Sequence, residues 1–194
     1  YRPELFSKDA SQLFRRIEKC QRALFKSLVN YASKNNLSLV VICKTREFSL
    51  QDREKNYFTK IAQSTDFEFT QSDKDGHEFD SYFKGLASEL IVHPSSTLGF
   101  ELFSAGKKVL FGADTDVSLV KDWGISHYFD ALPDLVKLRT DSSDTFSQTC
   151  DLIRQMPISE YLDTTRSHAK AIVSMPEGKY PHDVVCQLIS SYLV

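Results

Sequence analysis

Apolar residues in the first half of the chain change repeatedly between helical spacing and short unbroken runs. Between residues 9 and 35 they recur every three or four positions, which predicts a long amphipathic helix that ends at Asn35 and Asn36. Leu37 to Cys43 is a nearly continuous apolar run, typical of a strand covered by helices on both faces. The same patterns predict further helices over 50–63, 77–88 and 95–105, and further strands over 67–70, 90–92 and 109–111.

Regular alternation of strands and helices indicates an α/β fold, a Rossmann-like doubly wound parallel sheet. The last part of the chain favours helices near 142–156, 158–173 and 181–193, separated by Pro157 and a break at 175–178, and we interpret them as a helical C-terminal tail. We expect a single domain over residues 1–194. It divides into a linker or loop remnant (1–8), an α/β core (9–140) and the tail (141–194).

Composition narrows the function classes. The chain has 194 residues, 41% of them hydrophobic, with a formal net charge of -2, so a nucleic-acid partner is not expected. The four cysteines, Cys20, Cys43, Cys150 and Cys186, are far apart, which favours reduced thiols over a zinc site. No apolar run approaches the ~18 residues of a membrane span and no signal-peptide pattern is present, so we expect a cytoplasmic location.

Two strand ends carry candidate chemistry, because ligands of open parallel sheets bind beyond the carboxyl ends of the strands. Lys44 and Arg46 follow the apolar run 37–43 and bring two cations to that edge. The second strand end is the turn from His93 to Gly99, which leads into the helix predicted over 95–105.

The second strand end has the features of a phosphate site. We place Ser95 as the N-cap, which leaves the amides of Ser96, Thr97 and Leu98 without helical acceptors. Free amides, hydroxyls and the positive end of the helix dipole together favour an anion. The alternative is that Ser95 is only a good cap.

Two further residues of that helix, Gly99 and Glu101, extend the phosphate-site hypothesis. Gly99 inside a helix costs up to ~1 kcal/mol relative to Ala, and the close approach of a ligand or a neighbouring backbone would offset this cost. Glu101, about one turn on, is placed to accept hydrogen bonds from the vicinal hydroxyls of a ribose. Alternatively, Gly99 permits helix–sheet packing and Glu101 is solvated; the residues alone leave both interpretations open.

Three segments together resemble the donor-binding domain of GT-B-fold glycosyltransferases of bacterial surface-polysaccharide biosynthesis. They are Tyr82–Val92, the Ser-Ser-Thr-Leu-Gly-Phe-Glu block at 95–101, and the Gly-Lys-Lys-Val-Leu-Phe block at 106–111. The Val-Val-Ile-Cys-Lys-Thr-Arg segment at 40–46 is similar to a further part of that domain. The resemblance covers roughly residues 10 to 113.

The resemblance implies a nucleotide-sugar donor as substrate and assigns roles to the site residues. Ser95, Ser96 and Thr97 would hold the donor phosphate, and Glu101 the ribose. Lys44 and Arg46 would offset the phosphate charge, with His93 and Gly99 bordering the site. Such enzymes usually need no metal, so no cofactor is expected, and we interpret the Asp-Thr-Asp sequence at 114–116 as a polar turn.

The His93-Pro94 pair departs from a related pattern. Transferases that use CMP-activated sugars carry separate His-Pro and Ser-Ser/Thr motifs on two strand ends, whereas here the two are fused in one turn. This departure argues against a CMP-sugar donor. The other histidines, at 77, 127, 168 and 182, are expected to be structural or exposed, and Trp123 is expected to anchor a loop.

A complete GT-B enzyme has two such domains, and the acceptor and catalytic base usually belong to the other one. We therefore expect a glycan or lipid-linked acceptor to bind through a missing domain, peripheral membrane association of the intact protein, and no sugar transfer by this chain alone; no catalytic residue is assigned. Two alternatives stay open. One is a nucleotide-sugar epimerase-like domain, and the other is a non-catalytic α/β interaction module.

Overall fold

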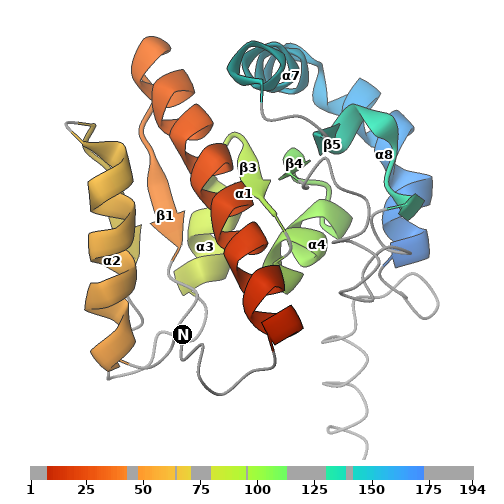
Figure 1. Ribbon diagram of the computed structural model, residues 1–194. Helices are drawn as coiled ribbons and strands as arrows, with labels where there is room; N and C mark the ends of the chain where they lie inside the picture. The colour runs from red at the N-terminus through yellow and green to blue at the C-terminus, as the bar shows by residue number, and fades with distance from the viewer. Residues whose placement is uncertain are drawn as a thin grey trace, which may run out of the picture.

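The computed structural model describes residues 8–42, 48–63, 65–70, 80–94, 96–112, 130–138 and 142–172, without the side chains of 8–17, 48 and 49 (Figure 1). Its elements are α1 (Lys8–Lys34), β1 (Val40–Ile42), α2 (Phe48–Ala62), β2 (Glu68–Thr70), α3 (Asp80–Ala87), β3 (Ile91–His93), α4 (Thr97–Ser104), β4 (Val109–Gly112), the 3-10 helix η2 (Asp134–Val136), β5 (Lys137–Leu138), α7 (Ser143–Gln155) and α8 (Ile158–Ile172).

The strands pair in parallel and form two small sheets. β1 pairs with β2, with Val41 opposite Phe69, and β3, β4 and β5 pair in that order, with Val92 opposite Leu110. Helices connect these strands, so the α/β class and the parallel pairing are confirmed. The pairings of the described residues give two separate sheets, where the sequence predicted one doubly wound sheet.

α1 joins the two sheets because its apolar face contacts a core on each. Phe25 and Val29 are buried in the core over β1 and β2, while Tyr31 belongs to the larger core around β4. The helix ends where Asn36 takes a left-handed φ of 52°, a conformation that Asn adopts more readily than most residues. The predicted end at Asn35 and Asn36 is thus confirmed.

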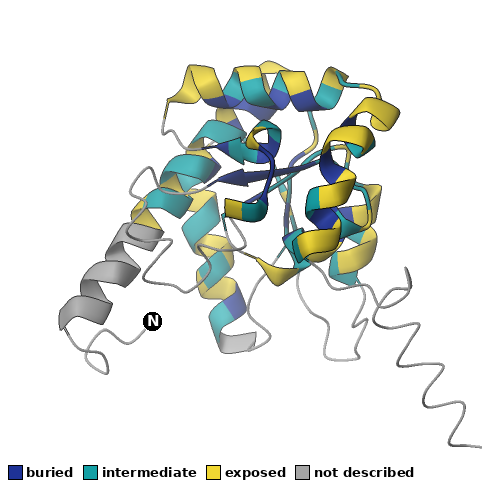
Figure 2. Cartoon of the chain, turned by 90° about the vertical axis from the view of Figure 1, so that its right-hand side faces the viewer, coloured by how far each residue is buried: buried dark blue, intermediate teal, exposed yellow. Residues whose placement is uncertain are grey.

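β4 is the most deeply buried strand. All four of its residues are buried, and since successive side chains of a strand point to opposite faces, both faces are covered. The covering core residues come from α1, α4, α7 and α8: Tyr31, Phe103, Phe146, Cys150, Ile153, Tyr161 and Ala169. Buried positions accordingly gather on the strands and the inner sides of the helices (Figure 2).

α7 and α8, predicted as part of a tail, are integral to this core. Phe146, Cys150 and Ile153 of α7 and Tyr161 of α8 are at most 1% exposed. The Tyr161 hydroxyl also accepts a hydrogen bond from the Val109 amide at 3.0 Å, which ties α8 to β4. The third predicted helix, 181–193, lies outside the described residues, and the division of the chain at residue 140 stays a prediction.

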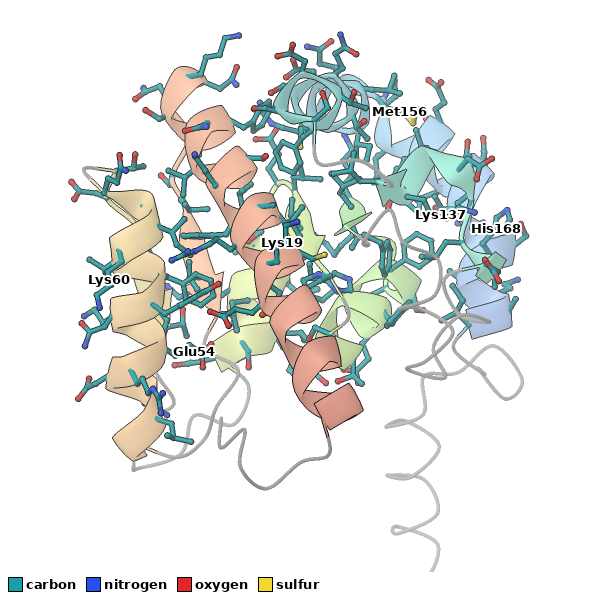
Figure 3. The ribbon with its side chains drawn as sticks, in the orientation of Figure 1. Lys19, Glu54, Lys60, Lys137, Met156 and His168 are labelled. Carbon is teal, nitrogen blue, oxygen red and sulfur yellow. The ribbon has the colours of Figure 1, made fainter. Side chains whose placement is uncertain are left out.

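A polar network fixes the amino end of β3, opposite the edge where the candidate site lies. Arg154 of α7 donates to both carboxylate oxygens of Glu89 at 3.1 and 3.2 Å, and to the Tyr31 hydroxyl at 3.1 Å. Lys108 donates to the carbonyls of Arg154 and Met156 at 2.7 and 2.6 Å. These bonds satisfy carbonyls at the end of α7, near Met156 in Figure 3, and hold that helix against the sheet.

Three local predictions were wrong. α2 begins at Phe48, two residues before the predicted start at residue 50. β1 begins only at Val40, where the apolar pattern predicted a strand from Leu37. β5 was not predicted at all, because its two residues follow directly on a 3-10 turn and leave no periodic pattern to detect.

α3 exposes apolar side chains. Phe83 is 67% and Leu86 47% exposed, whereas Gly85 is buried against Leu102 of α4. The apolar face that the sequence places at Phe79, Tyr82, Phe83 and Leu86 is therefore not a core face at its described positions, and Phe79 lies outside the described residues. No helix of the described residues is long and apolar enough to cross a membrane.

Candidate functional site

The turn between β3 and α4 forms the candidate site, and its cap lies one residue later than predicted. Ser96 is the N-cap of α4: its backbone is extended, with φ -87° and ψ 136°, and its carbonyl accepts from the amides of Gly99 and Phe100 at 3.1 and 3.4 Å. The prediction that Ser95 caps the helix was therefore wrong. Ser95 itself lies outside the described residues.

His93 supports this turn from inside the protein. It is the last residue of β3, is 7% exposed, and its ring packs edge-on against Phe111 and Phe100, with centroids 4.6 and 5.7 Å away. Its Nδ1 accepts a hydrogen bond from the Ser96 amide at 2.9 Å. The imidazole thus replaces the missing helical acceptor of the N-cap residue, and it fixes the backbone where α4 starts.

The surroundings of His93 keep it neutral. Burial lowers the pKa of His93 from 6.5 to about 3, since the charged form would lose its hydration without gaining a partner. With Nδ1 accepting from Ser96, the proton of the neutral ring belongs on Nε2, which is buried and without a hydrogen-bond partner in the structure. His93 therefore adds no positive charge to the turn. Direct contact with a ligand stays a prediction for this residue.

Gly99 is explained by the same histidine. A Cβ atom at Gly99 would overlap the His93 ring, with Nε2 the nearest atom. Only glycine lets the first turn of α4 lie directly on the imidazole, so the helix-propensity cost is offset by this packing. The sequence left open whether Gly99 makes room for a ligand or backbone or permits helix–sheet packing. The structure supports packing, because the group that closely approaches Gly99 is the His93 side chain.

The start of α4 has the composition of an anion site. Ser96 and Thr97 are exposed, and the Ser96 hydroxyl makes no capping hydrogen bond to the helix. The first turn contains no acidic residue, and the amides of Thr97 and Leu98 belong to the group that has no acceptor within a helix. Hydroxyls, first-turn amides and the positive helix end therefore occur together where α4 begins, at the carboxyl end of β3.

Glu101 lies on the next turn of α4 and is paired with a residue of α3. Its Oε2 accepts a hydrogen bond from the Tyr82 hydroxyl. This bond, followed by burial, raises the pKa of Tyr82 to about 12, so the phenol keeps its proton at neutral pH. Glu101 itself is exposed, and an ionised carboxylate has lone pairs for further donors beside Tyr82.

The other predicted part of the site, the strand end after β1, falls outside the described residues. Lys44 and Arg46 lie outside the described residues, as do the Asp-Thr-Asp sequence at 114–116 and Trp123. Of the scattered histidines only His168 is described: it belongs to α8 (Figure 3), and its Nδ1 lies 2.6 Å from the Ala131 carbonyl, which confirms a structural role.

Metal-ligating side chains do not gather within the described part of the chain, where no group of three or more His, Cys, Asp or Glu residues is placed to hold an ion. Cys150 is a buried free thiol, Cys20 is half-buried on α1, and Cys43 and Cys186 lie outside the described residues. The candidate site therefore consists of hydroxyls, amides and one carboxylate.

Comparison with known protein families identifies the biological setting. A family model described as "putative O-antigen biosynthesis protein" matches residues 4–176, which is most of the chain. The chain belongs to this family. No curated protein and no solved structure matches it.

Membership in this O-antigen biosynthesis family confirms the predicted link to surface-polysaccharide biosynthesis in its general form. The match covers both the β3–α4 turn and the helices α7 and α8, so the site and the core that supports it belong to one family unit. Sequence reasoning found the turn but missed two of its contacts. The His93–Ser96 bond depends on how the His93 ring is buried beneath the turn, and the Tyr82–Glu101 bond depends on how α3 and α4 pack.

Proposed function

We propose that this chain is the nucleotide-sugar-binding part of a metal-independent glycosyltransferase that acts in O-antigen synthesis. In this proposal the N-terminal turn of α4 binds the donor phosphate through Ser96, Thr97 and the free amides, and Glu101 binds the ribose. O-antigen is a polysaccharide, and its assembly requires activated sugars. A family described as an O-antigen biosynthesis protein supports a role for this chain among the steps that use such donors.

The observation that carries the proposal is the lack of a capping hydrogen bond from the helix to the Ser96 hydroxyl. An exposed N-cap serine normally uses its side chain to satisfy one of the first amides of its helix. Here the side chain makes no such bond, while the buried His93 holds the backbone of the turn in its place. In the proposal this hydroxyl and the amides of Thr97 and Leu98 together bind an external anion, and phosphate fits this set of donors.

The proposal also treats the two small sheets as halves of one Rossmann-like sheet with β1 next to β3. In that arrangement the carboxyl ends of β1 and β3 are neighbours where the strand order reverses, which is where open α/β sheets bind ligands. Lys44 and Arg46, just after β1, would then face the phosphate from the side opposite Ser96. Transfer itself requires a catalytic base and an acceptor site, which the proposal assigns to a further domain.

Calorimetric titration of the 194-residue chain with UDP, CDP, CMP and GDP tests the proposal. We expect at least one of the nucleotides to bind, and to bind equally well in the presence of EDTA. Ser96→Ala and Glu101→Ala should each weaken that nucleotide roughly tenfold or more, because each removes hydrogen bonds that involve a charged group. Ser143→Ala, which removes an exposed hydroxyl from the first turn of α7, is the matched control and should bind like the natural chain.

A stability measurement tests whether Ser96→Ala weakens binding without destabilising the fold. Ser142 caps α7 by accepting from the Thr145 amide, so Ser142→Ala should lower the free energy of unfolding by ~1 kcal/mol. Ser96→Ala should cost clearly less, since its hydroxyl makes no such bond. If none of the nucleotides binds, or if both site variants keep full affinity, the non-catalytic interaction module becomes the better interpretation.

A further inference from the structure

Tyr82 connects the exposed surface of α3 to the proposed ribose site. α3 and α4 pack side by side, with Gly85 of α3 buried against Leu102 of α4. This close packing brings the Tyr82 ring, which is 37% exposed, next to the first turns of α4, where its hydroxyl donates to Oε2 of Glu101. The bond joins two partly solvated residues on different helices.

A hydrogen bond at this place has a specific effect on a carboxylate. A free Glu side chain samples many rotamers, and a ligand that needs one of them pays for the ordering. A phenol that donates to one carboxylate oxygen selects the rotamer in advance and turns the remaining lone pairs in a defined direction. The Tyr82 phenol is suited to this because it stays protonated, and therefore a donor, throughout the neutral range.

We propose that Tyr82 is a positioning residue that orients Glu101 to receive the vicinal hydroxyls of a ribose, so that the site selects ribonucleotides over 2′-deoxyribonucleotides. The inference rests on the proposed function, because it assumes that a nucleotide binds at the start of α4. It extends that function by assigning sugar selectivity to a residue pair across α3 and α4. The alternative role for the pair is a brace between the two helices, independent of any ligand.

Binding of matched ribo and deoxy nucleotides separates these roles. The probes are UDP and 2′-deoxy-UDP, with the CDP and GDP pairs run in parallel, titrated into the natural chain, Tyr82→Phe, Glu101→Ala and the double variant. We expect the natural chain to prefer the ribo form about tenfold, the range of one hydrogen bond to a charged group. Tyr82→Phe should reduce this preference to about twofold or threefold, mainly by weakening the ribo form. Glu101→Ala should abolish the preference, and the double variant should match Glu101→Ala.

Tyr57→Phe is the matched control, because Tyr57 is a tyrosine of α2 whose hydroxyl donates to a backbone carbonyl, that of Glu18, at 3.5 Å. It should leave the ribo preference unchanged. A Tyr82→Phe variant with an unaltered preference would overturn the inference, as would a loss that is equal for both members of each pair, which is the result a brace predicts. If the natural chain binds nucleotides without preferring the ribo form, the inference about Tyr82 is overturned, but the proposed phosphate site is not contradicted. Absence of all nucleotide binding overturns the proposed function as well.

Discussion

The Gly99→Ala variant is expected to lose about 1–3 kcal/mol of unfolding free energy, even though alanine is the better helix former. The added methyl group would overlap the His93 ring, which is packed against Phe111 and Phe100 and bonded to the Ser96 amide. Because these partners hold the ring on several sides, either the start of α4 or the ring must move. Urea denaturation monitored by circular dichroism measures the loss.

A double-variant cycle assigns this loss to the His93 contact. In a His93→Ala background the ring is gone, so Gly99→Ala should be neutral or should stabilise the chain by up to ~1 kcal/mol, as expected for an ordinary helix position. The two substitutions are therefore strongly coupled. An equal cost in both backgrounds would show that Gly99 is needed for a reason other than the imidazole.

Acidification from pH 7 to pH 5 is expected to destabilise the protein through His93. The folded-state pKa of His93 is about 3, whereas the unfolded value is 6.5. Between these two values the unfolded chain binds a proton that the folded chain does not, so stability is highest above pH 6.5 and falls as the pH drops toward 3. Between pH 7 and pH 5 the loss from this residue should be about 2 kcal/mol.

His93→Asn isolates this contribution, because its Oδ1 keeps an acceptor near the position of Nδ1 and does not titrate. Unfolding free energies of both proteins at pH 7, 6 and 5 give the comparison. The natural chain should lose more stability than His93→Asn over this range, by the amount stated above. Identical pH profiles would mean that His93 is protonated or solvated in the folded state. The two proteins share every other ionisable residue, so the difference between their profiles reports on position 93.

Sequence patterns were informative where a single element determines the structure. The spacing of apolar residues located α1 and α2, and Gly106 marked the end of α4, where its φ of 82° allows the Lys107 amide to bond back to the Leu102 carbonyl at 3.0 Å. Each of these features depends on neighbours within a few positions. The turn after β3 was found for the same reason, since hydroxyl residues between an apolar strand and a helix are typical of a helix N-terminus.

The remainder depends on how side chains pack in three dimensions, even where the residues are close in sequence. The cap was placed at Ser95 because serine is favoured there, but the Ser96 amide is held by His93, and no local pattern predicts that bond. The exposed apolar residues of α3 have the spacing of a core face, so Phe83 could not be distinguished from a buried residue. The role of Gly99 was undecided until the histidine ring was seen beneath it.

The central claim is that the start of α4 binds the phosphate of a nucleotide, and the amides of its first turn report on this directly. The measurement is a titration of the ¹⁵N-labelled chain with UDP, CDP and GDP, followed by heteronuclear NMR. The account predicts that the Thr97 and Leu98 amide signals shift in a saturable way with at least one nucleotide, and that Ser96→Ala reduces the apparent affinity of the same shifts. Saturable shifts confined to other parts of the chain, or no shifts at all, would contradict it.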